Sequence, residues 1–154
     1  MGIAALITWI VTAIGGFTLL SVWLRRGGLQ QQAARATSFR SGLIFSHFLL
    51  AAAGLVLWLV YVVTDTDSLT WIALAVLAVV AVLGFTMFFR WLGVRRASPT
   101  AVGTGAGPGA GSAAPQAGAE PAERGLPVTV VAAHGLVAVV TVVLVLLAAL
   151  GVGS

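Results

Sequence analysis

The sequence contains two histidines, His47 and His134, and both lie inside long apolar stretches. Ionisable side chains are rare inside membrane-spanning segments, where they usually face the bundle interior and mark a functional site. An imidazole in such a place can ligate a metal through a ring nitrogen, carry a proton or make a hydrogen bond. The chain has no cysteine, which excludes disulfides, thiolate metal sites and thiol catalysis. The chemistry of the chain therefore depends on how the two imidazoles are placed.

A nine-residue motif occurs twice, and each copy is followed by an apolar stretch that carries one histidine. It reads GFTLLSVWL from Gly16 to Leu24 and GFTMFFRWL from Gly84 to Leu92. Five of the nine positions are identical, and they include phenylalanine, threonine and tryptophan, which are not abundant in this chain. The repeat predicts two helical hairpins, each a G-F-T helix followed by a histidine helix, related by an axis along the membrane normal.

The composition indicates how these histidines must be held. Hydrophobic residues make up 60% of the chain and charged residues 8%, whereas about 25% of a soluble domain is charged. Four apolar stretches are long enough for a membrane-spanning helix, which needs about 20 residues. They run over about 2–24, 41–63, 70–92 and, within residues 126–154, about 127–152. Because they lack the alternation of barrel strands, we expect an all-α, four-helix transmembrane bundle.

The first of these helices is expected to be retained in the protein. It lacks the positive n-region of a signal peptide, and Arg25 and Arg26 follow it where a small-residue cleavage site would be needed. Residues 1–96 would then hold the first three transmembrane helices.

The distribution of charge predicts an orientation. All eight basic residues are arginines, and they fall in the segments on one side of the four predicted helices. These are Arg25, Arg26, Arg35, Arg40, Arg90, Arg95, Arg96 and Arg124. The turn on the other side carries only Asp65 and Asp67. The positive-inside rule predicts a multi-pass protein of the cell membrane with the arginine side cytoplasmic and both termini outside. Contact with anionic lipid accounts for the basic charge without a nucleic-acid partner.

Residues 97–125 form the long connection between the third and fourth predicted helices. They are mostly Gly, Ala, Pro, Ser and Thr, a composition typical of a flexible linker. We expect this linker to be cytoplasmic and interpret Glu120, Glu123 and Arg124 as solvating charges. Pro127 then suits the first turn of the last helix.

Aromatic residues are predicted at two levels of the bundle. Trp23 and Trp91 on the arginine side, with Trp58, Tyr61 and Trp71 on the other, are expected to form the aromatic belts at the two membrane interfaces.

The histidines are predicted to lie at one depth. His47 is about six residues into the second helix and His134 about seven into the fourth, which places both about 10 Å below the arginine-side interface at a rise of 1.5 Å per residue. Phe17 and Phe85 lie at about the same depth on the first and third helices. Each of the four helices is therefore expected to carry one histidine or phenylalanine of this set at this depth.

Haem b is the cofactor that these residues favour. Bis-histidine ligation needs one imidazole nitrogen on each side of the porphyrin, which His47 and His134 could supply as iron ligands. Phe17 and Phe85 would line the pocket, and small residues such as Gly16 and Gly84 would leave room for a flat group, although small residues also serve close helix packing.

Two further sets of residues could complete such a site. Arg40 and Arg90, at the cytoplasmic ends of their helices, could bind the propionates. Thr18, Thr86 or a backbone carbonyl could accept the second ring N–H of each imidazole and fix its tautomer.

Other interpretations of the histidine pair stay open. Each imidazole could simply hydrogen-bond a neighbouring helix, a contact worth roughly 0.6 kcal/mol in membrane bundles. A proton, quinone or transport role is a third possibility. Two histidines with no further Cys, Asp or Glu at that depth would make a poor zinc or copper site.

On His47, His134 and the repeated G-F-T-x4-W-L, the chain resembles small four-helix b-type membrane cytochromes and a group of uncharacterised bacterial four-helix membrane proteins. The resemblance covers the four helices and not the linker. It implies a haem-binding electron-transfer or haem-handling subunit. Many such cytochromes hold two haems on four histidines, whereas this chain could hold one at most, so a redox role would need a partner, a quinone or a second copy.

The main alternative is a structural or accessory subunit of a larger membrane complex with no cofactor, and a small transporter is less favoured. No hydrolase or transferase constellation is visible, so we expect no enzymatic activity. The expected partners are the lipid bilayer and other membrane subunits, either copies of this chain or different ones.

Overall fold

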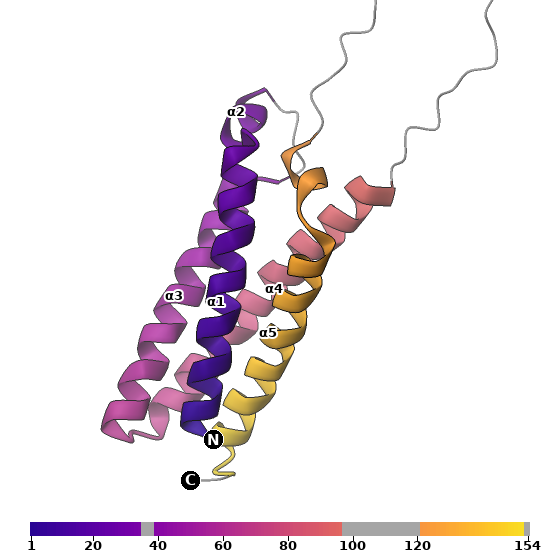
Figure 1. Cartoon of the computed structure of the whole chain (residues 1–154). Coiled ribbons are helices and arrows are strands. Elements are labelled where there is room, and N and C mark those ends of the chain that lie inside the picture. Colours follow the sequence, from indigo (N-terminus) through magenta and orange to yellow (C-terminus); the bar gives the residue numbers. More distant parts are fainter. Residues whose placement is uncertain (35–38, 97–120, 153–154) are drawn as a thin grey trace, which may run out of the picture.

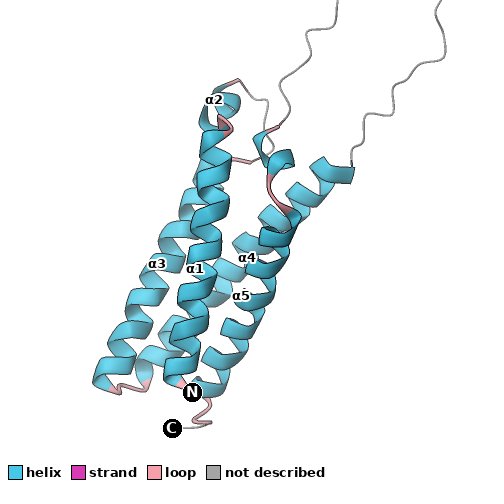
Figure 2. Cartoon of the chain, viewed as in Figure 1, coloured by secondary structure: helices cyan, strands magenta, loops and turns pink. Residues whose placement is uncertain are grey.

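The chain is mostly helical in the part that a computed structural model describes, residues 1–34, 39–96 and 121–152. The long helices are α1 (Gly2–Arg25), α3 (Ser41–Thr64), α4 (Ser68–Arg96) and α5 (Val128–Ala149), and the short ones are α2 (Gly28–Ala33) and the 3₁₀ helix η1 (Ala122–Gly125). Within these ranges there is no strand (Figure 2). Each long helix is apolar and long enough to cross a membrane. The prediction of an all-α fold with four helices long and apolar enough to span a membrane is confirmed.

The ends of the long helices follow from local chemistry. Asp65 closes α3 in the left-handed conformation, with φ 52°, which Asp tolerates better than most residues because its short polar side chain can hydrogen-bond locally. Gly27, with φ 75°, separates α1 from α2, and Pro127 immediately precedes α5. Helix α4 continues past the predicted end at 92, and in this extension the Arg95 guanidinium lies 5.2 Å from the centre of the Trp91 ring.

The start of α1 and the end of α5 lie at one end of the bundle, and α2 and η1 lie at the other (Figure 1). The arginines of the described part belong to segments at the α2 and η1 end. The charge asymmetry in the sequence therefore corresponds to a basic end of the bundle.

The helices pack most extensively as two antiparallel pairs, α1 with α5 and α3 with α4. Contacts between α1 and α3, and between α4 and α5, are fewer. The closest pairs are therefore not the two sequence hairpins α1/α3 and α4/α5, and the first helix of the chain packs mainly against the last.

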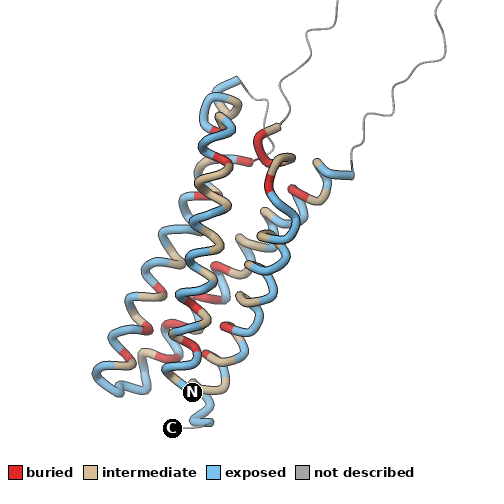
Figure 3. Tube along the Cα trace, in the orientation of Figure 1, coloured by how far each residue is buried: buried red, intermediate tan, exposed pale blue. Residues whose placement is uncertain are grey.

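The buried residues form two clusters, one toward each end of the bundle (Figure 3). The cluster near the termini contains Ala5, Trp9, Trp58, Tyr61, Ala73, Leu77, Val80 and Val145. The cluster near α2 and η1 contains Trp23, Phe39, Ile44, Trp91, Ala122 and Leu126.

The belt interpretation of the aromatic residues is wrong for most of them. Trp58 is fully buried, and its indole N–H donates to the Gly2 carbonyl at 3.1 Å. Trp23 and Trp91 are 2% and 5% exposed. Trp71, at 52% exposed, is the one that remains compatible with a belt. The large indoles fill space between helices that the many small residues of this chain leave open.

The segment before α5 is anchored to the bundle by hydrogen bonds. The Ala122 N–H donates to the Gln31 side-chain carbonyl of α2 at 2.7 Å. The guanidinium of Arg124 donates to the Val94 carbonyl near the end of α4 at 3.4 Å. The turn η1 thus ties α2 to the end of α4.

Burial in this turn corrects part of the linker prediction. Residues 97–120, including Glu120, lie outside the described residues, but Glu123 is fully buried. Gly125 packs directly against the guanidinium of Arg26, where a Cβ would have no room. The interpretation of Glu123 as a solvating charge is therefore wrong, because η1 is packed against α1, α2 and α4.

Candidate functional site

The two histidines come together at the level between the two buried clusters. His47 comes from α3 and His134 from α5, and their ring centres lie 6.5 Å apart with the ring planes at 65°. Both side chains are partly buried. The shared depth expected from the sequence corresponds to a direct juxtaposition of the two imidazoles.

Each imidazole is held by one backbone carbonyl of its closest partner helix. Nδ1 of His47 lies 3.0 Å from the Val80 carbonyl oxygen of α4, and Nδ1 of His134 lies 2.9 Å from the Thr12 carbonyl oxygen of α1. A carbonyl oxygen can only accept, so Nδ1 carries the hydrogen in both rings. In the neutral tautomer Nε2 then keeps its lone pair for a metal or a hydrogen-bond donor.

The motif glycines make these contacts possible. The accepting carbonyl lies four residues before Gly84 in one half and four residues before Gly16 in the other. A Cβ added at Gly84 would lie 3.2 Å from Cε1 of His47, and one added at Gly16 would lie 3.1 Å from Cε1 of His134. Because helical Cβ atoms tilt toward the N-terminus, a side chain there would also crowd the carbonyl one turn earlier. Glycine leaves both the ring and the carbonyl accessible.

The α1/α5 pair and the α3/α4 pair differ next to the histidine level, on the side away from the arginine-rich end. The hydroxyls of Thr12 and Thr141 lie 3.3 Å apart between α1 and α5. The residues at the corresponding positions of α4 and α3 are Val80 and Gly54. Gly54 lies against the Trp9 ring, with a hypothetical Cβ 2.9 Å from Cζ2. Two turns from His134 the helix therefore makes a polar contact with its neighbour, whereas two turns from His47 the corresponding residue packs against an indole.

The repeat threonines are not partners of the imidazoles. The Thr18 hydroxyl donates to the Ile14 carbonyl at 2.8 Å, and the Thr86 hydroxyl donates to the Val82 carbonyl at 2.9 Å. Both bonds are made inside their own helix. Of the two kinds of acceptor expected for the imidazoles, the structure shows backbone carbonyls and not the threonine hydroxyls.

The phenylalanines and arginines predicted around the site are exposed side chains. Phe17 and Phe85 are 59% and 55% exposed, so they form no buried pocket around the imidazoles. Arg40 and Arg90 are also exposed, near the arginine-rich end of the bundle. The sequence placed these side chains at suitable depths, but depth along a helix does not determine the direction in which a side chain points.

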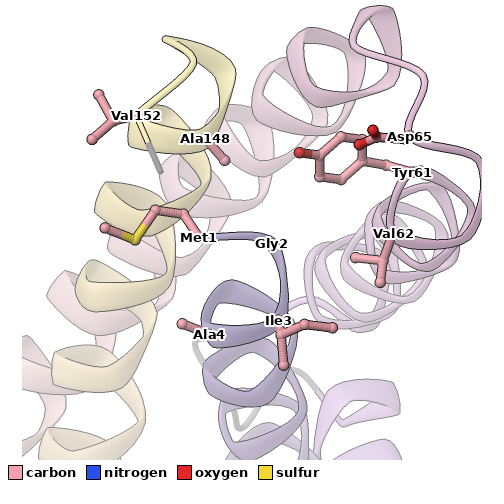
Figure 4. A pocket seen from close by; sticks show the side chains of 9 residues that line it. All are labelled: Met1, Gly2, Ile3, Ala4, Tyr61, Val62, Asp65, Ala148 and Val152. Carbon is pink, nitrogen blue, oxygen red and sulfur yellow. The ribbon is translucent and has the colours of Figure 1, made fainter. Parts of the chain in front are cut away.

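The described residues form at least two surface hollows. One, of about 350 Å³, lies between α1 and α5 and is bordered by His134. The larger, of about 460 Å³, lies at the opposite end, where Tyr61 and Asp65 of the α3 terminus approach Met1 and the end of α5 (Figure 4). Of these two hollows, the smaller one is bordered by a histidine.

The donor set fits a metal held by two imidazoles. Metal–imidazole bonds of about 2 Å on opposite sides of one ion place the ring centres roughly 6 Å apart, close to the 6.5 Å between His47 and His134. Among the described residues no group of three or more His, Cys, Asp or Glu could hold a metal ion. The separation of the two rings is therefore compatible with an ion held between the two imidazoles.

The carbonyls of Thr12 and Val80 were not identified from the sequence as the specific partners of the imidazoles. The signal was present, since each lies four residues before the glycine of the repeated motif.

Comparison of the chain with protein-family models, with curated proteins and with solved structures gives no match.

Proposed function

We propose that this protein is a membrane subunit that binds one haem b between His47 and His134 and serves electron transfer or haem handling. The observation that carries the proposal is the paired geometry of the rings, 6.5 Å apart, each with Nδ1–H bound to a carbonyl and Nε2 left as the donor atom. Haem held by two histidines supplies one-electron chemistry.

The surrounding residues prepare the imidazoles for this role. The carbonyls of Val80 and Thr12 hold each ring in one tautomer and orientation, as outer-shell partners of metal-bound histidines generally do. The α1/α5 pair packs less extensively against the α3/α4 pair than the two helices of each pair pack against each other. Because His47 and His134 come from different pairs, a flat group between the two rings would lie between the pairs. Arg40 and Arg90 are the proposed partners of the propionates.

We further infer that the bundle arose from two copies of one helical hairpin. The support is the matched set of contacts, in which Gly16 packs on His134 as Gly84 packs on His47. The arginine-rich end is assigned to the cytoplasm by the positive-inside rule, which puts both termini outside.

The test is an absorbance spectrum of the protein purified from cells supplied with haem. A low-spin reduced spectrum is expected from the wild type, and His47→Ala or His134→Ala should each abolish it because both axial ligands are needed. Thr86→Val is a control within the repeat motif and should keep the spectrum, since its hydroxyl bonds only its own helix. A wild-type protein that stays colourless when haem is added would refute the proposal.

The second candidate is a structural subunit without a cofactor. It is favoured by the fact that both imidazoles already join two helices through a backbone carbonyl. Each contact would then contribute roughly 0.6 kcal/mol to the free energy of unfolding. A colourless protein in which the two alanine substitutions add within about 0.5 kcal/mol would support this candidate.

A further inference from the structure

The smaller hollow is bordered by residues that differ between the two copies of the repeat. It lies between α1 and α5, where Val11, Ile14 and Gly15 form one wall and Thr129 and Ala133 belong to the other. Gly15 contributes no side chain, and a Cβ added there would lie 3.4 Å from both Cβ and Nδ1 of His134. A larger side chain at Gly15 would therefore be placed at the edge of this space, in contact with the histidine.

The other half of the chain provides an internal comparison. By the spacing of the two motifs, Gly15 corresponds to Leu83 of α4, and Val137, which also borders the hollow, corresponds to Leu50 of α3. Both leucines are partly buried. The positions occupied by Gly15 and Val137 in the α1/α5 pair are therefore occupied by larger leucine side chains in the α3/α4 pair.

The surroundings of the hollow indicate an occupant from the bilayer. Val11 and Ile14 are 49% and 62% exposed on a helix apolar enough to span a membrane, so the hollow opens toward lipid chains. The same helix ends in Arg25, which is exposed, and Arg26 follows. Ten residues separate Gly15 from Arg25, about 15 Å along a helix, which is about half of the hydrocarbon thickness.

We propose that the hollow between α1 and α5 binds one acyl chain of an anionic phospholipid from the leaflet on the arginine-rich side, with the phosphate at Arg25. Charge complementarity selects the occupant, because basic groups at the ends of neighbouring spanning helices bind anionic head groups. Thr129, which also borders the hollow, offers a hydroxyl to the polar glycerol region of such a lipid. This lipid site does not depend on haem binding.

Native mass spectrometry of the protein in micelles tests the site. The probes are phosphatidylglycerol and phosphatidylcholine with identical acyl chains. The wild type should retain phosphatidylglycerol preferentially, and Arg25→Gln should reduce that preference about fivefold, as expected for one surface arginine. Gly15→Leu, which restores the residue of the other half, should lower the retention of both lipids because the side chain fills the hollow.

The matched control is Gly135→Leu, since Gly135 lies next to His134 on α5 and a Cβ there meets nothing within 4 Å. This variant should retain lipid as the wild type does. If Gly15→Leu yields no folded helices, Gly15→Ala and Arg25→Gln decide the question. Equal retention of the two lipids by the wild type, undiminished retention after filling the hollow, or retention of a neutral quinone in place of phospholipid would each overturn the proposal.

Discussion

The imidazole of His134 lies against Gly16, where a Cβ would stand 3.1 Å from its Cε1 atom. A separation this short means that any side chain at Gly16 must displace the ring, and the ring is tied through Nδ1 to the carbonyl of Thr12 one turn away. The same relationship holds between Gly84 and His47. The glycine of the motif and the histidine of the other copy thus act as one packing unit.

Replacement of either motif glycine by leucine should therefore destabilise the bundle. Gly16→Leu and Gly84→Leu are each expected to lower the free energy of unfolding by about 2 kcal/mol, the usual cost of overpacking. Unfolding in a titration with sodium dodecyl sulfate measures the change. Gly135→Leu is the control, because a Cβ there meets no neighbour. Similar losses at all three positions would show that the histidine contacts are not special.

The hydroxyl pair between α1 and α5 should contribute a small, coupled stabilisation. Thr141→Val keeps the shape of the side chain but removes its hydrogen bond to the Val137 carbonyl and its contact with the Thr12 hydroxyl, so the free energy of unfolding should fall by about 0.6 kcal/mol. A double-mutant cycle with Thr12→Val should show that the losses are not additive. Thr86→Val, whose hydroxyl is exposed and bonds within its own helix, should be nearly neutral.

The absence of cysteine makes the orientation simple to measure. Thr66→Cys, in the turn between α3 and α4, should react with a membrane-impermeant maleimide added to intact cells, and Ala34→Cys, after α2, should not. The physical reason is the retention of arginine-rich segments in the cytoplasm. Labelling of both positions after the cells are opened is the control for reactivity. The opposite pattern in intact cells would reverse the proposed orientation.

The contact between α2 and η1 should control local opening of the turn before α5. Gln31→Ala removes the acceptor of the Ala122 N–H, a loss of about 1 kcal/mol that corresponds to roughly fivefold faster hydrogen exchange at this amide. Hydrogen exchange followed by mass spectrometry measures it. The neighbouring exposed Gln30 provides the matched control, and Gln30→Ala should leave exchange at Ala122 unchanged. Equal protection in the two variants would contradict the anchoring role.

Composition was sufficient to predict the four spanning helices, because a long continuous apolar stretch in a membrane has few alternatives to a helix. The common depth of His47 and His134 also followed from counting residues along helices. The rotation of each helix about its axis could not be predicted, since nearly uniform apolar surfaces give no clear polar side. For this reason Phe17 and Phe85 were placed in a pocket although they are exposed.

The burial of side chains near the ends of the bundle also could not be predicted from the sequence. Trp23 and Trp91 occupy the positions at which belt residues are usual, yet both are enclosed. Glu123 follows a stretch rich in Gly and Ala, and a charged residue in such a context suggests solvent. Its burial depends on the contacts of η1 with α1, α2 and α4, elements distant in the sequence.

The pairing of the first helix with the last has a consequence for biosynthesis. The His47 contact with the Val80 carbonyl joins α3 to α4, which leave the ribosome one after the other. The contact between His134 and the Thr12 carbonyl joins the two ends of the chain and cannot form until α5 has been made. Until then α1 carries Gly16 without its imidazole partner, because α1, α3 and α4 all precede α5 in the chain. Truncation after α4 would leave this glycine surface of α1 available to any other membrane helix that offers a side chain of suitable shape.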